Sequence, residues 1–193
     1  MSEEVVPNKK KSVKKTLLIT AIVLVVMVGG VAGTYAVLHD DPGFCNALCH
    51  SPMDPYVASY EQGISIKKDQ SSAVLLVARH KESAADINCL SCHEPSFEEQ
   101  IAEGMKWISG EFNEPLKPLR YDGKEFCLRP ECHEGIETED DLARATENLE
   151  FNPHDSHMPD LACDQCHQVH EQSEMMCRQC HSGAELPAGW KEP

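Results

Sequence analysis

The sequence Cys89-Leu90-Ser91-Cys92-His93 sets the pattern that decides this fold, and the same form returns at residues 163–167 and 177–181. All ten cysteines of the 193-residue chain fall into five pairs, and a histidine follows the second cysteine of each pair. Two thiolates so spaced can add across the vinyl groups of one haem while the adjacent histidine ligates the iron. The pattern therefore predicts five covalent haem c groups, on Cys45, Cys49, Cys89, Cys92, Cys127, Cys132, Cys163, Cys166, Cys177 and Cys180, with His50, His93, His133, His167 and His181 as motif ligands.

Two of the five motifs are stretched, with three residues between Cys45 and Cys49 and four between Cys127 and Cys132. The last four cysteines also have the spacing of a zinc ribbon. A zinc site or a disulfide framework gives no reason for a histidine after every pair, so the haem interpretation is favoured over both.

The histidine count supports this interpretation, because five irons with two axial histidines each would use ten, and the chain has ten. Iron that is saturated by two side chains transfers electrons and leaves no position open for a substrate. The sequence thus predicts that most of the haems serve electron transfer, with distal ligands drawn from His39, His80, His154, His157 and His170.

An uncharged run from Leu17 to Leu38 is long enough to cross a membrane, and five lysines precede it. The lysines predict a cytoplasmic basic tail (1–15), a transmembrane helix (16–38) and an extracytoplasmic haem domain (39–193) in a single-pass cell-membrane protein. A cleaved signal peptide is the alternative, although the run exceeds the usual length of its apolar region. Gly29 and Gly33 form a GxxxG step that would suit a homo-oligomer, but glycine is common in membrane spans.

Residues 1–15 hold five lysines and two of the acidic residues, so residues 16–193 carry 12 basic and 30 acidic side chains. This charge excludes nucleic acid as a partner and favours a protein with a basic docking face. A solubilising role for the acidity is the alternative. With 6% aromatic residues, the domain can build only a modest core of its own, and haems would supply the rest.

We therefore expect a mostly α-helical and irregular fold, in which one N-terminal transmembrane helix precedes a small haem-packed domain of short helices and loops. The expected helices run from Ser71/Ser72 to Ala85, from Phe97 to Ile108, and from Thr138 to Leu149, where Thr138 and Asp141 form a capping box. No strand is expected. Pro115, Pro118, Asp122 and Gly123 mark a loop between a two-haem part (39–115) and a three-haem part (120–185).

The N-terminal third resembles the membrane-anchored quinol dehydrogenases of the NapC/NirT family. The features that carry this resemblance are a single membrane helix, the stretch Phe44-Cys45…Cys49-His50…Met53 that follows it, and His80 ahead of Cys89-Leu-Ser-Cys92-His93-Glu-Pro95. The resemblance implies that the haem nearest the membrane takes electrons from menaquinol. It implies Met53 or His50 as a ligand of that haem, with His39 as a further candidate. The Cys45–Cys49 spacer and the His50–Met53 gap are both longer than the family pattern.

A lysine follows the second haem motif of that family near the quinol, and Lys106, flanked by Glu103 and Trp107, occupies a comparable place. Quinol oxidation releases protons, and a site for it needs a group that can accept or hydrogen-bond them. The alternative is that Lys106 and Glu103 form a helical ion pair on a solvated face.

The C-terminal part resembles the tetrahaem domains of flavocytochrome c fumarate reductases. The resemblance is carried by Asn152-Pro-His154-Asp-Ser-His157 and by the haem motifs at 163–167 and 177–181. This resemblance implies His154, His157 and His170 as distal ligands, with His80 serving a fourth haem.

Together these features predict a pentahaem cytochrome that oxidises menaquinol and supplies an extracytoplasmic terminal reductase, which by analogy is a flavoprotein. The chain has no dinucleotide fingerprint of its own. A quinone-independent relay to extracellular or soluble acceptors and a terminal haem reductase remain as alternatives, as does a structural or sensory role.

Overall fold

The computed structural model describes residues 9–39, 41–67, 74–84, 86–117, 123–158 and 161–193, apart from the side chains of residues 9–12 and 48–50. Its helices are α1 (Lys9–Leu38), α2 (Pro42–Gln62), α3 (Leu76–Ser83), α4 (Phe97–Ser109), α5 (Gly123–Cys127) and α6 (Glu139–Ala145), with the 3₁₀ turns η1 (Cys89–Ser91), η2 (Cys163–Gln165) and η3 (Met176–Gln179). Across these described ranges no strand forms, and an isolated bridge pairs Glu174 with Lys191. The predicted fold class of helices and loops is confirmed.

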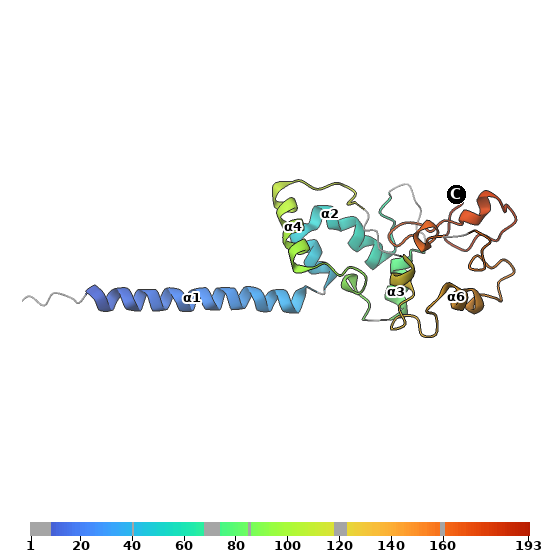
Figure 1. Ribbon diagram of the computed structural model, residues 1–193. Coiled ribbons are helices and arrows are strands. Elements are labelled where there is room, and N and C mark those ends of the chain that lie inside the picture. The colour runs from blue at the N-terminus through green and yellow to red at the C-terminus, as the bar shows by residue number, and fades with distance from the viewer. Residues whose placement is uncertain (1–8, 40, 68–73, 85, 118–122, 159–160) are drawn as a thin grey trace, which may run out of the picture.

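Helix α1 projects from the rest of the molecule as a single rod (Figure 1). Its segment Val13–Leu38 is apolar and long enough to cross a membrane, and none of it is buried against the domain. A helix with these properties is typical of a membrane anchor or of a signal sequence. The helix begins at Lys9, so part of the predicted basic tail is helical.

Helix α2 is missing from the sequence-based prediction, although it carries the first haem motif. It starts on a cap in which Asp41 Oδ1 accepts a hydrogen bond from Gly43 N at 2.6 Å, with proline at the first helical position. It ends at Gly63, whose φ of 65° lies in the left-handed region that favours glycine. Pro52 and Pro55 stand inside it, which is why the sequence did not indicate a helix.

The three predicted domain helices exist, two of them with altered lengths. Helix α4 matches its prediction and adds an unforeseen capping box between Ser96 and Glu99. Helix α6 has the predicted Thr138–Asp141 box but ends at Ala145, because the Thr146 side chain turns back to bond the preceding turn. Helix α3 begins only at Leu76, and the predicted caps Ser71 and Ser72 lie outside the described residues.

The loop predicted around residues 115–123 is shorter than expected on its C-terminal side, because Gly123 is the first residue of α5. The predicted markers Pro118 and Asp122 lie outside the described residues, whereas Pro115 follows α4 in irregular chain.

Few side chains of the described domain are buried. The buried apolar residues of the described domain are Pro52, Tyr60, Leu75, Met175 and Ala184. Residues 169 and 170 lie between α2 and α3, since His170 O accepts from Ile66 N and Val169 O accepts from Val77 N, both at 3.1 Å. Segments from the two predicted parts of the domain are therefore interleaved.

Candidate haem-binding sites

The three motifs with a two-residue spacer form the same local turn. In each, a 3₁₀ turn starts at or beside the first cysteine, and the histidine N–H donates to the carbonyl of that cysteine. The N–O distance is 2.8 Å at His93, at His167 and at His181. The turn places both cysteines and the histidine on one compact loop, as one haem requires.

The two motifs with longer spacers bring their cysteines and histidine together through other local structures. Cys45 and Cys49 both belong to α2, where positions four apart share one helix face. In the other stretched motif, His133 N donates to Arg129 O at 3.0 Å, so Arg129 takes the place of the first cysteine in the turn. Cys127 then sits two residues earlier, as the last residue of α5.

Four of the histidines outside the motifs each lie against one motif histidine. Ring centroids are 6.1 Å apart for His93 and His170, and 6.2 Å apart for His80 and His133. They are 6.2 Å apart for His154 and His167, and 5.8 Å apart for His157 and His181. The structure thus brings the four predicted distal histidines to four different motifs, a matching that the sequence could not give.

This spacing suits a metal between the rings. A ligating imidazole nitrogen lies about 2 Å from its metal and the ring centre about 1 Å further, so two opposed imidazoles have centroids about 6 Å apart. Burial lowers the pKa of His93, His154 and His167, and lowers that of His170 to about 4. The neutral imidazole, which is the form that ligates metals, is therefore favoured.

Hydrogen bonds orient three of the distal histidines through Nδ1. His80 Nδ1 lies 2.9 Å from Leu76 O, His170 Nδ1 lies 2.7 Å from Ser59 Oγ, and His154 Nδ1 lies 3.1 Å from Thr146 Oγ1. Ser59 Oγ donates its own proton to Tyr56 O at 2.6 Å, so it accepts from His170. A donor at Nδ1 fixes the tautomer and leaves Nε2 for iron. These positioning groups have no motif in the sequence that could have identified them.

The first motif lies where α1 meets the domain. The His39 ring stacks on Tyr35 at 5.0 Å, and Tyr35 in turn meets the edge of Phe44, the neighbour of Cys45. Met53 is half-buried one helical turn after Cys49. The side chains of Cys49 and His50 lie outside the described residues.

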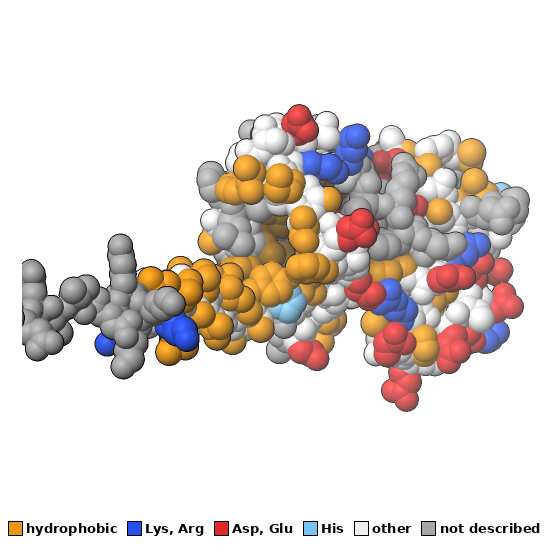
Figure 2. Space-filling view, turned by 60° about the vertical axis from the view of Figure 1, so that its left-hand side comes forward, with side chains coloured by type: hydrophobic (Ala, Val, Ile, Leu, Met, Phe, Trp, Pro, Cys, Tyr) orange, Lys and Arg blue, Asp and Glu red, His pale blue; other side chains and the backbone are white. Residues whose placement is uncertain are grey.

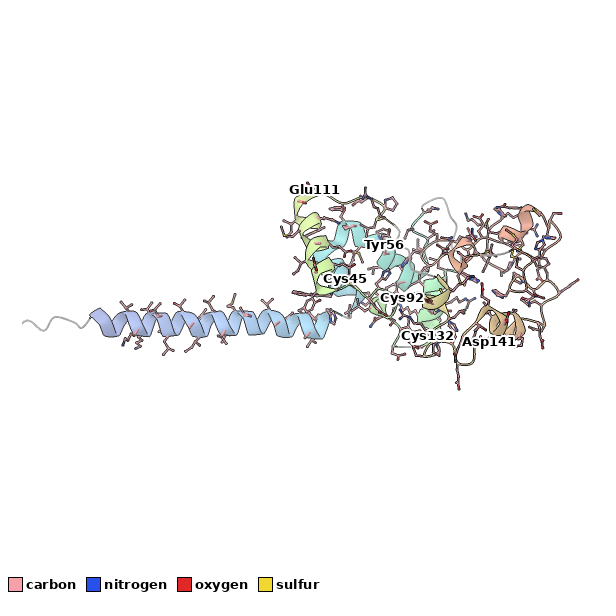
Figure 3. The ribbon with its side chains drawn as sticks, in the orientation of Figure 1. Cys45, Tyr56, Cys92, Glu111, Cys132 and Asp141 are labelled. Atoms are coloured by element: carbon pink, nitrogen blue, oxygen red, sulfur yellow. The ribbon has the colours of Figure 1, made fainter. Side chains whose placement is uncertain are left out.

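Successive motifs are neighbours in space. Burial raises the pKa of Cys89, and the nearby Cys45 raises it further. Burial likewise raises the pKa of Cys92, and the nearby Cys132 raises it further. Burial, and then Cys163, raises the pKa of Cys127 to about 11. Burial raises the pKa of Cys166, and the nearby Cys177 raises it further. Figure 3 labels Cys45, Cys92 and Cys132, which lie progressively further from α1.

The whole chain resembles a known cytochrome. It is 37% identical over 208 residues to the cytochrome c-type protein Cgr1 of Eggerthella lenta, across 98% of this chain and 94% of that protein. The chain belongs to this c-type cytochrome family. As a multihaem c-type cytochrome it transfers electrons and carries haem c. Residues 113–182 also match the family described as cytochrome c3, a range that holds three of the motifs.

Two further relatives each match about half of the length of this cytochrome. It is 32% identical over 108 residues to the cytochrome c-type protein NrfB of Escherichia coli, across 50% of each chain. It is 29% identical over 105 residues to the acrylate reductase cytochrome subunit of Shewanella woodyi, across 53% of this chain and 69% of that one. One of these two relatives is thus named as the cytochrome subunit of a reductase. No solved structure matches the chain.

The predicted quinol-site residues lie on α4 of the cytochrome. Lys106 and Glu103 are both exposed, and within the described residues no ion pair joins them. The Glu103 carboxylate is near enough to His93 to raise its pKa against the larger, lowering effect of burial. Lys106 O accepts from Glu111 N at 2.8 Å, so the lysine belongs to the closing turn of the helix. The helix therefore places Glu103 beside the second motif.

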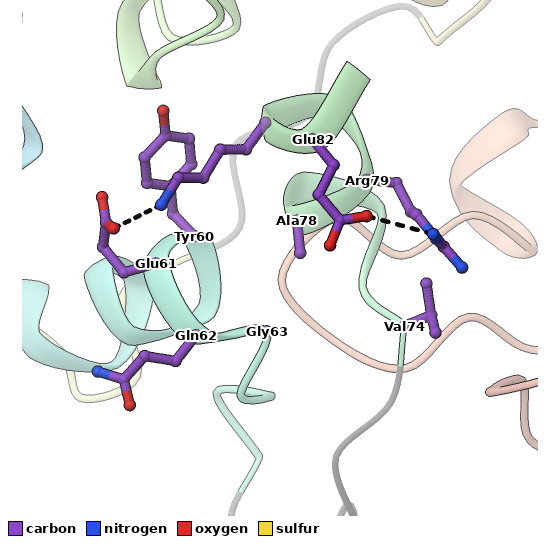
Figure 4. A pocket seen from close by; sticks show the side chains of 9 residues that line it. Tyr60, Glu61, Gln62, Gly63, Val74, Ala78, Arg79 and Glu82 are labelled. Carbon is purple, nitrogen blue, oxygen red and sulfur yellow. Dashed lines mark hydrogen bonds and ion pairs between the residues drawn. The ribbon is translucent and has the colours of Figure 1, made fainter. Parts of the chain in front are cut away.

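A cavity of about 540 Å³ between α2 and α3 is separate from the haem motifs. Figure 4 shows two ion pairs on its wall, between Lys81 and Glu61 at 2.5 Å and between Arg79 and Glu82 at 3.2 Å. No cysteine or histidine lines it among the described residues, so the iron ligands gather elsewhere.

Proposed function

We propose that this cytochrome is anchored in the cell membrane by α1, binds five haems, oxidises menaquinol and passes the electrons to an extracytoplasmic reductase. When bound, the haems supply one-electron transfer in sequence. The observation that carries the proposal is the pairing of four distal histidines with four motif histidines in a molecule whose first motif adjoins an exposed apolar helix.

The pairings propose a ligand set for haems two to five in motif order. His93 and His170 would hold the second haem, His133 and His80 the third, His167 and His154 the fourth, and His181 and His157 the fifth. Two protein ligands at each iron leave no position for a substrate, so these haems would serve only electron transfer.

The first haem would differ from the others. Its cysteines lie on a helix, and its ligands would come from His50, Met53 and His39. All three belong to the stretch just after the apolar span, where a quinol in the bilayer has access. Because neighbouring motifs follow chain order, electrons that enter here would leave through the C-terminal haems.

Quinol oxidation also needs groups that hydrogen-bond the quinol or accept its protons, for which we propose Lys106 and Glu103 on α4. Helix α4 is tied to the end of α1, since the Tyr35 hydroxyl donates to Gln100 Oε1. Glu103 lies close to the second haem motif. Both groups are thus held near the proposed point of electron entry.

The partner would be an extracytoplasmic reductase with a basic docking face, because the domain is strongly acidic. A relative that matches only 38 residues, at 45% identity, is the probable fumarate reductase Ifc3 of Shewanella frigidimarina. Together with the acrylate reductase cytochrome subunit, it favours a reductase as the electron acceptor, and we propose a flavin-dependent one.

The test is anaerobic mixing of the detergent-solubilised protein with a menaquinol analogue after the covalent haems have been counted. We expect fast reduction of five haems, and a rate about 100-fold lower in Lys106→Ala because a group that hydrogen-bonds the quinol is lost. Lys117→Ala, an exposed lysine outside α4, is the matched control. Slow reduction by quinol together with rapid reduction by a soluble donor would instead support the quinone-independent relay.

A further inference from the structure

Helix α4 carries a row of large apolar side chains that the domain does not cover. Phe97 is 73% exposed, Ile101 53%, Met105 61% and Ile108 71%. At 100° per residue these four positions fall within about 80° of the helix circumference, and every charged residue of α4 falls outside that arc. We call this row the α4 stripe.

Beside the stripe, one face of α4 is half-buried against the domain and another face carries the charged residues. Gln100 and Gly104 are half-buried toward the domain, next to the stripe on the helix wheel. Glu98, Glu99, Glu103 and Lys106 occupy the polar side. An apolar arc beside a charged arc is typical of a helix that lies in a membrane surface.

The position of α4 selects the bilayer as the occupant of the stripe. The Tyr35 hydroxyl donates to Gln100 Oε1, which holds α4 at the level where the apolar span ends at Leu38. Helix α4 runs across the direction of α1 at the end of the domain that α1 enters (Figure 1). Apolar side chains continue from α1 onto that end of the domain (Figure 2).

Aromatic side chains are exposed on both helices. Tyr35 and Trp107 are 38% and 36% exposed, one near the end of α1 and one on the flank of α4. Tyr and Trp are enriched where hydrocarbon meets the headgroups.

We infer that α4 is an interfacial helix whose stripe inserts into the outer leaflet of the same bilayer that α1 spans. The inference rests on the proposed anchoring by α1. Its consequence is that the domain has two points of attachment, so the first haem motif faces the lipid in one fixed orientation.

The test is hydrophobic photolabelling of the full-length haem-loaded protein in nanodiscs whose lipids carry a diazirine in the acyl chain. Mass spectrometry then locates the labelled residues. We expect label on α1 and on the stripe. In the double variant Ile101→Glu/Ile108→Glu, stripe labelling should fall about fivefold or more, because the charged side chains leave the hydrocarbon, while α1 labelling stays unchanged.

The matched control is Ala102→Glu, which adds the same side chain next to Ile101 but on the exposed polar side of α4. It should leave stripe labelling unchanged. Label on α1 with none on the stripe would overturn the inference and leave the proposed anchor standing. An absence of label on both helices would overturn the anchor. Cross-linking of one stripe to a second copy or to another protein, in place of lipid label, would assign the stripe to a protein contact and also overturn the inference.

Discussion

The half of the domain next to α1 and the half beyond residue 123 contain haem motifs of the same chemistry in different kinds of structure. Near α1, the chain forms α2 of 21 residues and α4 of 13, both capped at each end. Beyond residue 123, the longest helix is α6 with seven residues, and two of the motifs form turns of three or four residues. Helices this short are unstable alone, so that half depends on contacts made around its haems.

The largest effect should come from removing one haem in each half. In Cys163→Ser/Cys166→Ser, we expect loss of one haem and general proteolysis of residues 123–193, because neighbouring motifs on both sides lose their packing. In Cys45→Ser/Cys49→Ser, one haem is lost but the capped α2 should stay resistant. Haem counting and limited proteolysis measure both. Equal proteolysis in the two variants would contradict the contrast.

The next effect concerns the pairing of His80 with His133, which links the two halves. His80→Ala should create one high-spin haem that binds carbon monoxide, because an iron loses its sixth ligand. Combining it with Cys127→Ser/Cys132→Ser should remove that signal, whereas combining it with Cys89→Ser/Cys92→Ser should leave it. Electron paramagnetic resonance reports the spin state. The reverse pattern would assign His80 to the second haem.

A smaller effect is expected from the hydroxyls that orient distal histidines in each half, Ser59 near α1 and Thr146 beyond residue 123. Ser59→Ala and Thr146→Val remove an acceptor from Nδ1–H, which makes the imidazole a weaker donor to ferric iron. A tenfold change in the ferric-to-ferrous balance corresponds to about 60 mV for one electron, and we expect a rise of this order in one haem. Spectroelectrochemical titration measures it; unchanged potentials would remove these hydroxyls from the site.

The smallest effect compares the two capping boxes. Hydrogen bonds from the Ser96 backbone and side chain lower the pKa of Glu99 below its ordinary value of 4.5, and the Thr138 side chain lowers that of Asp141 below 3.8. Each ionised carboxylate therefore stabilises its helix fully when the pH is above the ordinary pKa of that group. This stabilisation is lost as the pH falls through the lower pKa of the folded state. Amide exchange in nanodiscs, corrected for intrinsic rates, should show α6 fraying at pH 3 while the lipid-held α4 stays protected. Asp141→Asn should abolish the pH dependence of α6, whereas Glu99→Gln should leave the protection of α4 unchanged.

Sequence reasoning could predict the parts of this molecule whose signals are local. The motif cysteines, the apolar span, α4 and the Thr138–Asp141 box were all indicated by neighbouring residues. Helix α2 was missed because its interior prolines argue against a helix, although its Asp41 cap tolerates the first proline. The matching of distal to motif histidines was out of reach, because it depends on contacts between distant segments such as Ser59 and His170, which are 111 positions apart.

The backbone bonds that hold residues 169 and 170 between α2 and α3 also set an order in time. During synthesis, Cys89 and Cys92 are made long before His170. The second haem would be attached while its proposed distal ligand is still unmade, whereas the proposed ligands of the third haem, His80 and His133, would both be made earlier. A chain truncated between residues 133 and 170 would therefore lack the proposed distal ligand of its second haem, next to the motif where electrons are proposed to enter, while its third haem would keep both proposed ligands.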